Sequence, residues 1–353
     1  MMTLDRVNSL GRSSLKRLIL GVLAWGLSLV LAMGMIGQLT QDRSVMLGLL
    51  MYLPTAPLGV VAIAFDLSRR GGALGPGRVR YGLAWVGLTG AFVASLPLVT
   101  LGGGSPRPGE IGLLQWNVMW GGGPFRDEST WNAQCSALRA SGASVLVLSE
   151  APERSWLDRL DVALGPGWRG AEVEGDSGWP HWFHVAVYAR GPVVLERRLS
   201  LPNGSAGVFL VRPHGRELRL LVVDGVSDPL LPRTPFLKAV ADLCQKAKAE
   251  GRPFDAVLGD FNAPARCLGF AFLADAGYQL ASRAGGPGPQ WRGTFPALLP
   301  VLDIDHVWIS PRWEARSCRL FHAPWSDHRA QVVRFSEKTR SRPSLANRPI
   351  DMR

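Results

Sequence analysis

Cysteine and histidine are scarce in this sequence of 353 residues, which contains four cysteines and six histidines. The cysteines, Cys135, Cys244, Cys267 and Cys318, are widely spaced, and no cluster of cysteine and histidine has zinc-ligand spacing. Cys135 and Cys244 fall on predicted helices, where a buried free thiol is common. We therefore predict reduced core cysteines. Disulfides are the alternative if the domain lies in an oxidising compartment.

Charge is nearly absent from three runs in the first hundred residues, Leu18 to Ile36, Ser44 to Phe65 and Tyr81 to Leu101. Each run is near the ~20 apolar residues that cross a bilayer. No small-residue cleavage site follows the first run, which argues against a signal peptide. We predict three transmembrane helices, kinked where Pro54, Pro57 and Pro97 fall. A buried helical bundle is the alternative.

Basic residues flank these runs unevenly. The first loop carries only Asp42 and Arg43, whereas the N-terminal segment and the second loop are basic, with Arg6, Arg12, Lys16 and Arg17 in the one and Arg69, Arg70, Arg78 and Arg80 in the other. By the positive-inside rule, the N-terminus and the second loop are cytoplasmic. Three crossings then place everything after Gly102 in the periplasm or outside the cell, anchored to the cell (inner) membrane.

The formal net charge of +11 raises the possibility of a nucleic-acid-binding protein. The excess is unevenly distributed, however. Residues 1–100 carry nine Lys/Arg against three Asp/Glu, and residues 337–353 carry five against two, which leaves +2 for the segment between them. Bulk charge therefore does not predict nucleic-acid binding by the central domain.

Four segments are predicted. Residues 1–101 form the membrane anchor, 102–109 a flexible linker rich in glycine, 110–336 an α/β domain, and 337–353 a disordered basic tail that is polar and contains proline. In the α/β domain, a strand at Ile111–Val118, a helix at Ser129–Ala140 and a strand at Ser144–Ser149 form a β-α-β unit. Its right-handed parallel crossover brings Asn117 and Glu150 to one sheet edge.

The middle of the domain has a different pattern. Two antiparallel pairs are predicted, His184–Arg190 with Val193–Leu199 and Val208–Val211 with Leu218–Asp224. A loop rich in glycine and tryptophan, Trp168–Pro180, is predicted to cover the site. A helix at Thr234–Glu250 then leads into the next strand. His181 and His184 are predicted to be structural residues because isolated histidines near strand starts are usually hydrogen-bonded.

Three further strand ends carry chemistry. The strand before Gly259-Asp260-Phe261-Asn262 ends in a carboxylate that can orient a water and an amide that can donate to an oxyanion. Asp305 begins another strand, and Asp327-His328 precedes the last one. An aspartate opposite an imidazole would fix its tautomer and raise its basicity. These residues, with Asn117 and Glu150, predict one site at the edge of a sheet.

As an ordered set, Trp116-Asn117-Val118, Glu150, Gly259-Asp260-Phe261-Asn262, Ile304-Asp305-His306-Val307 and Ser326-Asp327-His328 resemble the motifs of the endonuclease/exonuclease/phosphatase family. The resemblance covers about residues 110–336. It implies an α/β (α+β) four-layer sandwich of two central β-sheets flanked by helices, here preceded by three transmembrane helices. It further implies a metal-dependent phosphoesterase.

By match to the family's motifs, Glu150 would be the principal ligand of a Mg²⁺ or Mn²⁺ ion, and Asp327 and Asn117 would complete its coordination. Asp260 would activate the attacking water and Asn262 would steady a phosphate oxygen. Asp305 would orient His328 against the scissile phosphate. A hard cation held by oxygen ligands suits this chemistry, because it polarises the phosphate oxygens.

One position departs from the family's pattern. Many members carry a histidine at the end of the strand before the long helix, and this chain has Asp224, which cannot donate a hydrogen bond while ionised. His181, His184 or Arg233 could substitute for it. The expected substrates are phosphoesters of lipid head groups, nucleotides or nucleic acid, and no protein partner is predictable. The alternative is a non-catalytic, membrane-anchored binding or sensing module.

Overall fold

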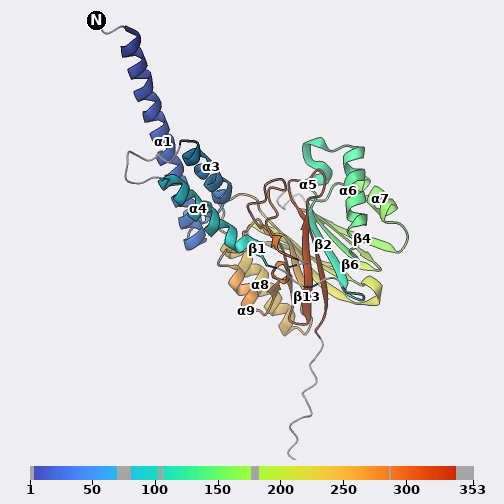
Figure 1. The fold of residues 1–353 in the computed structure, drawn as a ribbon. Helices are drawn as coiled ribbons and strands as arrows, with labels where there is room; N and C mark the ends of the chain where they lie inside the picture. The colour runs from blue at the N-terminus through green and yellow to red at the C-terminus, as the bar shows by residue number, and fades with distance from the viewer. Residues whose placement is uncertain are drawn as a thin grey trace, which may run out of the picture.

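The computed structural model describes residues 4–69, 81–101, 104, 107–175, 183–285 and 288–338. A set of N-terminal helices lies beside a larger α/β body, and the first helix projects away from that body (Figure 1). Of the predicted features, the side chains of Arg6, Arg12 and Arg17, the loop residues 70–80, linker residues 102–103 and 105–106, loop residues 176–182 and tail residues 339–353 lie outside the described residues. The boundaries of the four predicted segments remain predictions.

The first large sheet has six strands in the order β13-β14-β2-β3-β5-β4. Its members are β2 (Ile111–Asn117), β3 (Val145–Ser149), β4 (Trp168–Glu174), β5 (His184–Arg190), β13 (Trp313–Phe321) and β14 (Ala330–Glu337). Strands β2 and β3 are parallel, with Asn117 opposite Ser149. The helix between them is α6 (Glu128–Ala140). The predicted β-α-β unit is therefore confirmed, and it places Asn117 beside the start of the Glu150 loop.

The second large sheet has six strands in the order β10-β12-β9-β8-β7-β6. Its members are β6 (Val193–Leu201), β7 (Gly204–Val211), β8 (Leu218–Gly225), β9 (Ala256–Asp260), β10 (Gln279–Leu280) and β12 (Asp305–Ile309). Strands β8 and β9 run parallel and pair Asp224 with Asp260. Strands β9 and β12 run antiparallel and pair Asp260 with Asp305. Three carboxylate residues therefore stand in one row across the end of this sheet.

The two sheets pack face to face with helices outside, which gives four layers. Alternate side chains of β2 show why, since Leu113 joins the cluster between the sheets while Leu114 and Trp116 join the cluster beneath α6 and α7 (Arg154–Leu164). The opposite outer layer holds α8 (Arg233–Ala249) and α9 (Phe270–Asp275) against β8 and β9. Both faces of each central strand are buried, as expected for such apolar runs. The predicted two-sheet sandwich is confirmed.

Two details of the sequence-based prediction are wrong. His184–Arg190 and Val193–Leu199 do not form a hairpin, because β5 pairs with β3 and β4 while β6 pairs with β7 in the other sheet. Gly191, at φ 138°, lets the chain turn between the two sheets at this point. In addition, Trp168–Glu174 is strand β4 at a sheet edge, so the predicted covering loop is mostly a strand. The second antiparallel pair, β7 with β8, is confirmed.

The prediction of three transmembrane helices is not supported. Within the described residues, only the Leu18–Thr40 part of α1 (Leu4–Thr40) is long and apolar enough to cross a membrane alone. The second apolar run is broken at Pro54 into α2 (Val45–Met51) and α3 (Thr55–Ser68), which pass the same test only as a pair bent by 57°. The third run forms α4 (Gly82–Ser95), which is shorter and ends where Pro97 tightens the chain into a 3-10 turn.

All four cysteines are free and buried, as predicted. Cys135 lies on α6 and Cys244 on α8, each inside a hydrophobic cluster. They contribute apolar packing to the core.

Candidate active site

The candidate site lies where the two sheets present their polar strand ends to each other. Asp260 ends β9 and Asp305 begins β12, and both are buried. Gly259 makes this row possible, because a Cβ atom there would lie 1.9 Å from the carbonyl oxygen of Val223 on β8. The glycine of the Gly-Asp-Phe-Asn motif therefore allows the close strand approach that sets Asp260 beside Asp224.

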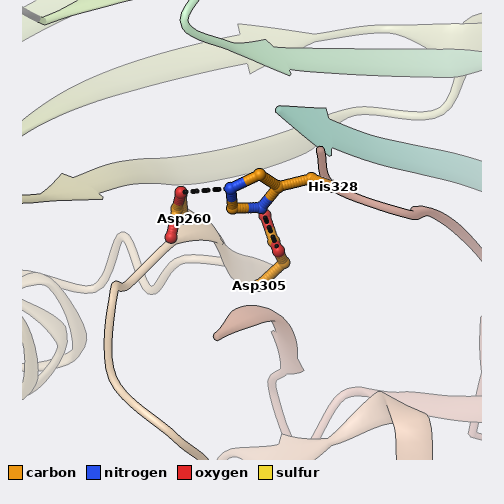
Figure 2. Close-up of side chains that lie close together, drawn as sticks. All are labelled: Asp260, Asp305 and His328. Carbon is orange, nitrogen blue, oxygen red and sulfur yellow. Dashed lines mark hydrogen bonds and ion pairs between the residues drawn. The ribbon is translucent and has the colours of Figure 1, made fainter. Parts of the chain in front are cut away.

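An aspartate–histidine pair forms the centre of the site. His328 Nδ1 lies 2.7 Å from Asp305 Oδ2, and the other ring nitrogen, Nε2, lies 3.8 Å from Asp260 Oδ2 (Figure 2). The imidazole thus stands between two carboxylates that come from neighbouring strands of the second sheet. The hydrogen bond to Asp305 leaves Nε2 as the nitrogen that is available for chemistry.

Asp305 is itself held in place. Gln115 on β2 donates from Nε2 to Asp305 Oδ1 at 3.0 Å, and Gln331 on β14 donates to Gln115 Oε1 at 2.8 Å. Thr294 Oγ1 accepts the backbone N–H of Asp305 at 3.3 Å. All these residues are buried, so the carboxylate has little freedom to rotate away from the imidazole.

The loop that carries His328 is tied to the end of β2. Ser326 donates from Oγ to the carbonyl oxygen of Asn117 at 2.7 Å and accepts the backbone N–H of His328 at 3.0 Å. Trp116 donates its indole N–H to the carbonyl oxygen of His328 at 3.1 Å. The serine of the Ser-Asp-His motif therefore sets the backbone from which the histidine projects.

Asp260 and Asn262 are joined to the same frame. Asn117 donates from Nδ2 to Asp260 Oδ2 at 3.0 Å, and the backbone N–H of Asn262 donates to Asp260 Oδ1 at 2.9 Å. The Asn262 side chain donates one N–H to the carbonyl oxygen of Gly225 at 2.8 Å. Since an amide nitrogen carries two hydrogens, the second N–H of Asn262 remains available to a ligand.

Burial and mutual charge set the protonation of the central groups. Burial alone would lower the pKa of His328, but the charges of Asp305 and Asp260 raise it to about 10. Burial would raise the pKa of Asp305, but the charge and hydrogen bond of His328 outweigh that effect and lower it. Burial and the charge of Asp305 together raise the pKa of Asp260 to about 7. At neutral pH, His328 is therefore an imidazolium beside an ionised Asp305.

Glu150 and Asp327 occupy the open side of the site. Glu150 follows β3 and has a left-handed backbone, with φ 47°. Burial raises its pKa, and a hydrogen bond from Asn117 opposes this effect. The Asp327 side chain is half-exposed, with Oδ1 4.0 Å from His328 Nε2. Left-handed backbones are unusual for residues other than glycine. Several such residues belong to the loops of the site: Met119, Trp120, Glu150, Asn262 and Trp325.

This donor set fits a hard divalent cation. Glu150 and Asp327 supply carboxylate oxygens, and Asn117 Oδ1 keeps one lone pair free while it accepts the backbone N–H of Met119 at 2.9 Å. Ligand atoms of Asp260, Asp305 and His328 also lie within 4.8 Å of one another. In that group, however, Nδ1 is engaged by Asp305, and a protonated imidazole cannot bind a metal. The oxygens of Glu150, Asp327 and Asn117 are therefore a second candidate set for a cation, beside the group of Asp260, Asp305 and His328.

A cavity of about 500 Å³ opens beside Glu150. Asp224, Ser205 and Asn262 line it, and Ser205 is the strand partner of Asp224. Burial raises the pKa of Asp224 well above its usual value, and the charges of Asp260 and Glu150 add to that effect. Within the described residues, the buried Ser205 hydroxyl has no hydrogen-bond partner.

Neither described substitute for the missing family histidine reaches the cavity as a donor. His184 is buried with Nε2 3.2 Å from Glu172, which agrees with the structural role predicted for it. Arg233 is buried and donates to the carbonyl oxygens of Val226 and Asp228, so its guanidinium is already engaged. His181 lies outside the described residues.

The structure thus brings together, at one edge of the two sheets, all seven residues predicted from the strand ends: Asn117, Glu150, Asp260, Asn262, Asp305, Asp327 and His328. Sequence reasoning missed Gln115, Gln331, Thr294 and Tyr52. For Gln115 a signal was present, since it is a polar residue inside an otherwise apolar run that ends at Asn117, whereas the strand of Gln331 also contains Arg334, Ser336 and Glu337. Tyr52 had no such signal, because it lies 210 positions from Asn262, the residue whose carbonyl oxygen it contacts.

Comparisons with known proteins bear on the family and the fold. A family model described as "Endonuclease/Exonuclease/phosphatase family" matches residues 114–328. A solved family protein from Bacteroides thetaiotaomicron is 16% identical with a TM-score of 0.50, covering 66% of this chain and 100% of its own. The human Nocturnin catalytic domain is 18% identical with a TM-score of 0.48, covering 66% of this chain and 96% of its own. No curated protein matches the sequence.

Proposed function

The chain belongs to the endonuclease/exonuclease/phosphatase family, and from this membership we propose that it is a divalent-metal-dependent phosphoester hydrolase. The observation that carries the proposal is the buried relay in which Asp305 holds His328 at 2.7 Å while Nε2 of the same ring lies 3.8 Å from Asp260. Burying a charged imidazole with one nitrogen free lowers the stability of the folded state. A phosphate anion bound beside Nε2 would offset that cost.

Glu150, Asp327 and Asn117 would hold the metal ion, for which we propose Mg²⁺ or Mn²⁺. When bound, the ion would polarise the phosphate oxygens and neutralise charge that develops on them. The fit rests on the donor chemistry, since carboxylate and amide oxygens are the ligands that these cations prefer. It also rests on charge, because Glu150 and Asp260 both have raised pKa values at a site rich in carboxylates.

The chain's own residues supply the remaining steps. His328 Nε2–H would donate to a phosphate oxygen, and Asp305 would keep the ring charged and oriented. Asp260, with a pKa of about 7, would accept the proton of the attacking water. Asn262 would donate its second amide hydrogen to another phosphate oxygen. Each of these groups is fixed by a hydrogen bond to a neighbouring strand end, which is the preorganisation that hydrolysis requires.

Asp224 can fill the place of the family's histidine in its protonated form. Burial and the charges of Asp260 and Glu150 raise its pKa well above the usual value, which favours the protonated carboxyl that can donate a hydrogen bond. Asp224 would then serve as a neutral donor toward a ligand in the Glu150 cavity. The departure from the family's pattern is therefore compatible with catalysis.

We also propose that α1 anchors the enzyme in the cell (inner) membrane with the catalytic domain in the periplasm or outside the cell. Residues near the C-terminal end of α1 contact the catalytic domain, since Arg266 donates to Gln38 Oε1 at 3.1 Å and the backbone N–H of Leu268 to Asp42 Oδ1 at 2.6 Å. The basic N-terminal segment favours a cytoplasmic N-terminus. The opposite end of α1, with the domain beside it, would then lie on the far side.

The test is hydrolysis of bis-(p-nitrophenyl) phosphate and p-nitrophenyl phosphate by the full chain in detergent, with Mg²⁺, Mn²⁺ or EDTA. We expect turnover that requires the metal and falls about 100-fold or more in Glu150→Gln. The matched control is Glu250→Gln, which makes the same change at an exposed carboxylate at the end of α8. A folded wild-type chain without turnover under any metal would favour the non-catalytic binding module instead.

A further inference from the structure

The N-terminal helices are fixed to the catalytic domain at the edge of the site. Tyr52, between α2 and α3, donates to the carbonyl oxygen of Asn262 at 2.8 Å, and Arg266 contacts Gln38 at the end of α1. After α4, β1 (Val99–Thr100) pairs with β11 (Gln290–Trp291). The helical segment is therefore attached at several points, so the position of the site relative to the helices is set by the fold.

Those helices present large apolar side chains to the surroundings. Exposed examples occur on α1, α3 and α4: Leu18, Val22, Trp25, Leu29, Val60, Val61, Trp85 and Phe92. A continuous surface of this kind is not stable in water, and it suits the acyl chains of a bilayer. A lipid phase around these helices would lie close to the catalytic domain, because the helices stand beside it (Figure 1).

The loops that carry site residues also expose large apolar side chains. Trp325, which is 51% exposed, immediately precedes Ser326-Asp327-His328, and its ring lies 6.3 Å from that of Phe125, which is 67% exposed. Leu298 and Leu299 are 87% and 56% exposed. Their loop is tied to the site, because the backbone N–H of Ala297 donates to the carbonyl oxygen of Asp327 at 2.6 Å. We call Phe125, Leu298, Leu299 and Trp325 the apolar rim.

A cavity lies between the helices and Leu299, one residue of the apolar rim. Its volume is about 620 Å³, and it is lined by Val60 of α3, Ala91 of α4, Trp291 and Leu299 of the catalytic domain, and Arg329. Arg329 is the one charged residue of this lining and directly follows His328. An apolar cavity whose lining includes one cation matches an acyl chain joined to an anionic head group.

We propose that the apolar rim inserts into the lipid surface that surrounds the helices, so that the site accepts a phosphoester borne on a lipid. The occupant of the rim is the bilayer, because Leu299 of the rim lines the same cavity as Val60 and Ala91 of the apolar helices. The substrate class rests on the proposed hydrolase function, whereas the insertion of the rim does not. Among the described residues, the four side chains of the apolar rim carry no charge that would bind the flanking phosphates of a nucleic acid.

The insertion is tested in nanodiscs of phosphatidylcholine and phosphatidylglycerol that hold the full chain. An environment-sensitive fluorophore is attached at Leu298→Cys, since the four native cysteines are buried. The matched control is Val162→Cys on α7, an equally exposed position at 83% that lies away from the rim. We expect blue-shifted emission and quenching by doxyl-labelled lipid for the label at 298 only. Emission typical of water at both positions, or a shift that persists in detergent-free oligomers without lipid, would overturn the insertion.

The substrate class is tested with alkyl p-nitrophenyl phosphate diesters whose alkyl group grows from methyl to octyl. We expect kcat/KM to rise about tenfold or more along the series, as chain burial contributes to binding. The double variant Leu298→Ser/Leu299→Ser should lose more activity on the octyl ester than on the methyl ester. Equal kcat/KM along the series would overturn the lipid substrate and leave the hydrolase standing. Absence of hydrolysis of every ester would instead refute the hydrolase, while the fluorophore still reports on the rim.

Discussion

The Tyr52 hydroxyl donates to the carbonyl oxygen of Asn262 at 2.8 Å, so a residue of the N-terminal helices supports the backbone of the Gly-Asp-Phe-Asn motif. Asn262 has a left-handed backbone, at φ 47°, that its own residue type tolerates but does not enforce. Arg233 donates from Nε to the same hydroxyl at 3.2 Å and fixes its orientation. The N-terminal helices therefore take part in shaping the site.

Replacing Tyr52 with phenylalanine removes this support and leaves the ring in place. We expect kcat for bis-(p-nitrophenyl) phosphate to fall about three- to tenfold, because a small displacement of Asn262 and Asp260 weakens a preorganised site. The free energy of unfolding should fall by about 1 kcal/mol. Steady-state kinetics and denaturant titration of the full chain provide the two measurements.

Tyr278→Phe is the matched control for that change. Tyr278 donates to the carbonyl oxygen of Phe254 at 2.9 Å in the hydrophobic cluster beneath α8 and α9, away from the site. The Tyr278→Phe variant therefore loses a buried hydrogen bond of the same kind. A similar loss of stability with kcat retained is expected. Equal loss of kcat in both variants would mean that Tyr52 acts only through stability.

We propose that Asp305 is a positioning residue, and Asp305→Asn tests that role. The amide keeps the shape of the side chain but cannot stabilise the imidazolium, so the pKa of His328 should fall from about 10 toward neutral. We expect kcat to drop about 10²- to 10⁴-fold, and the alkaline limb of the pH profile of kcat/KM to move to lower pH. A loss of activity with an unmoved alkaline limb would assign Asp305 a purely structural role.

The catalytic fold could be predicted from sequence because its signals are local. Apolar strands that end in Asn117, Glu150 and Asp260 carry both the sheet pattern and the site, since parallel strand ends meet at one edge of a sheet. Gln115 was missed although it was visible, because a polar residue in a buried strand shows its purpose only when its partner, Asp305 on the other sheet, is known.

The N-terminal region and the sheet assignment of β5 and β6 could not be predicted, for a different physical reason. An uncharged run gives the total apolar length, but a single proline decides whether that length is one helix, and Pro54 divides the second run. Likewise, a turn such as Gly191-Pro192 reads as a hairpin unless the sheet that receives each strand is known. The contact between Tyr52 and Asn262 depends on tertiary packing and has no local pattern.

His306 should make folding stability sensitive to acid. It is buried, with Nε2 2.8 Å from the carbonyl oxygen of Ala263 and its ring 4.9 Å from that of Phe270, and burial lowers its pKa below 6.5. Above pH 6.5 both folded and unfolded states carry a neutral ring. As pH falls below 6.5, the unfolded chain binds a proton that the folded chain excludes, so stability declines by up to about 1.4 kcal/mol per pH unit.

His306→Gln should remove that component, because glutamine can donate to Ala263 without titrating. Denaturant titrations of the full chain in EDTA, between pH 8 and pH 5, measure the slope of the unfolding free energy against pH. This pH range extends about one and a half units on either side of 6.5. His322→Gln, at an exposed histidine, is the control and should keep the wild-type slope. Parallel slopes in wild type and His306→Gln would show that the acid sensitivity arises elsewhere.

Asp224 lines the cavity beside Glu150. Two substitutions of Asp224 can distinguish a protonated carboxyl that donates a hydrogen bond from an ionised carboxylate. If the buried carboxyl acts in its protonated form, Asp224→Asn keeps a hydrogen-bond donor of the same size and should retain kcat/KM within about threefold, whereas Asp224→Ala should lose about tenfold or more. Asp224→Asn should also flatten any decline of kcat/KM that accompanies ionisation of this carboxyl as pH rises. Steady-state kinetics of the two variants across pH measures both effects. If Asn and Ala reduce activity equally, the site uses the negative charge of Asp224, and the residue then belongs with the carboxylates that attract the cation.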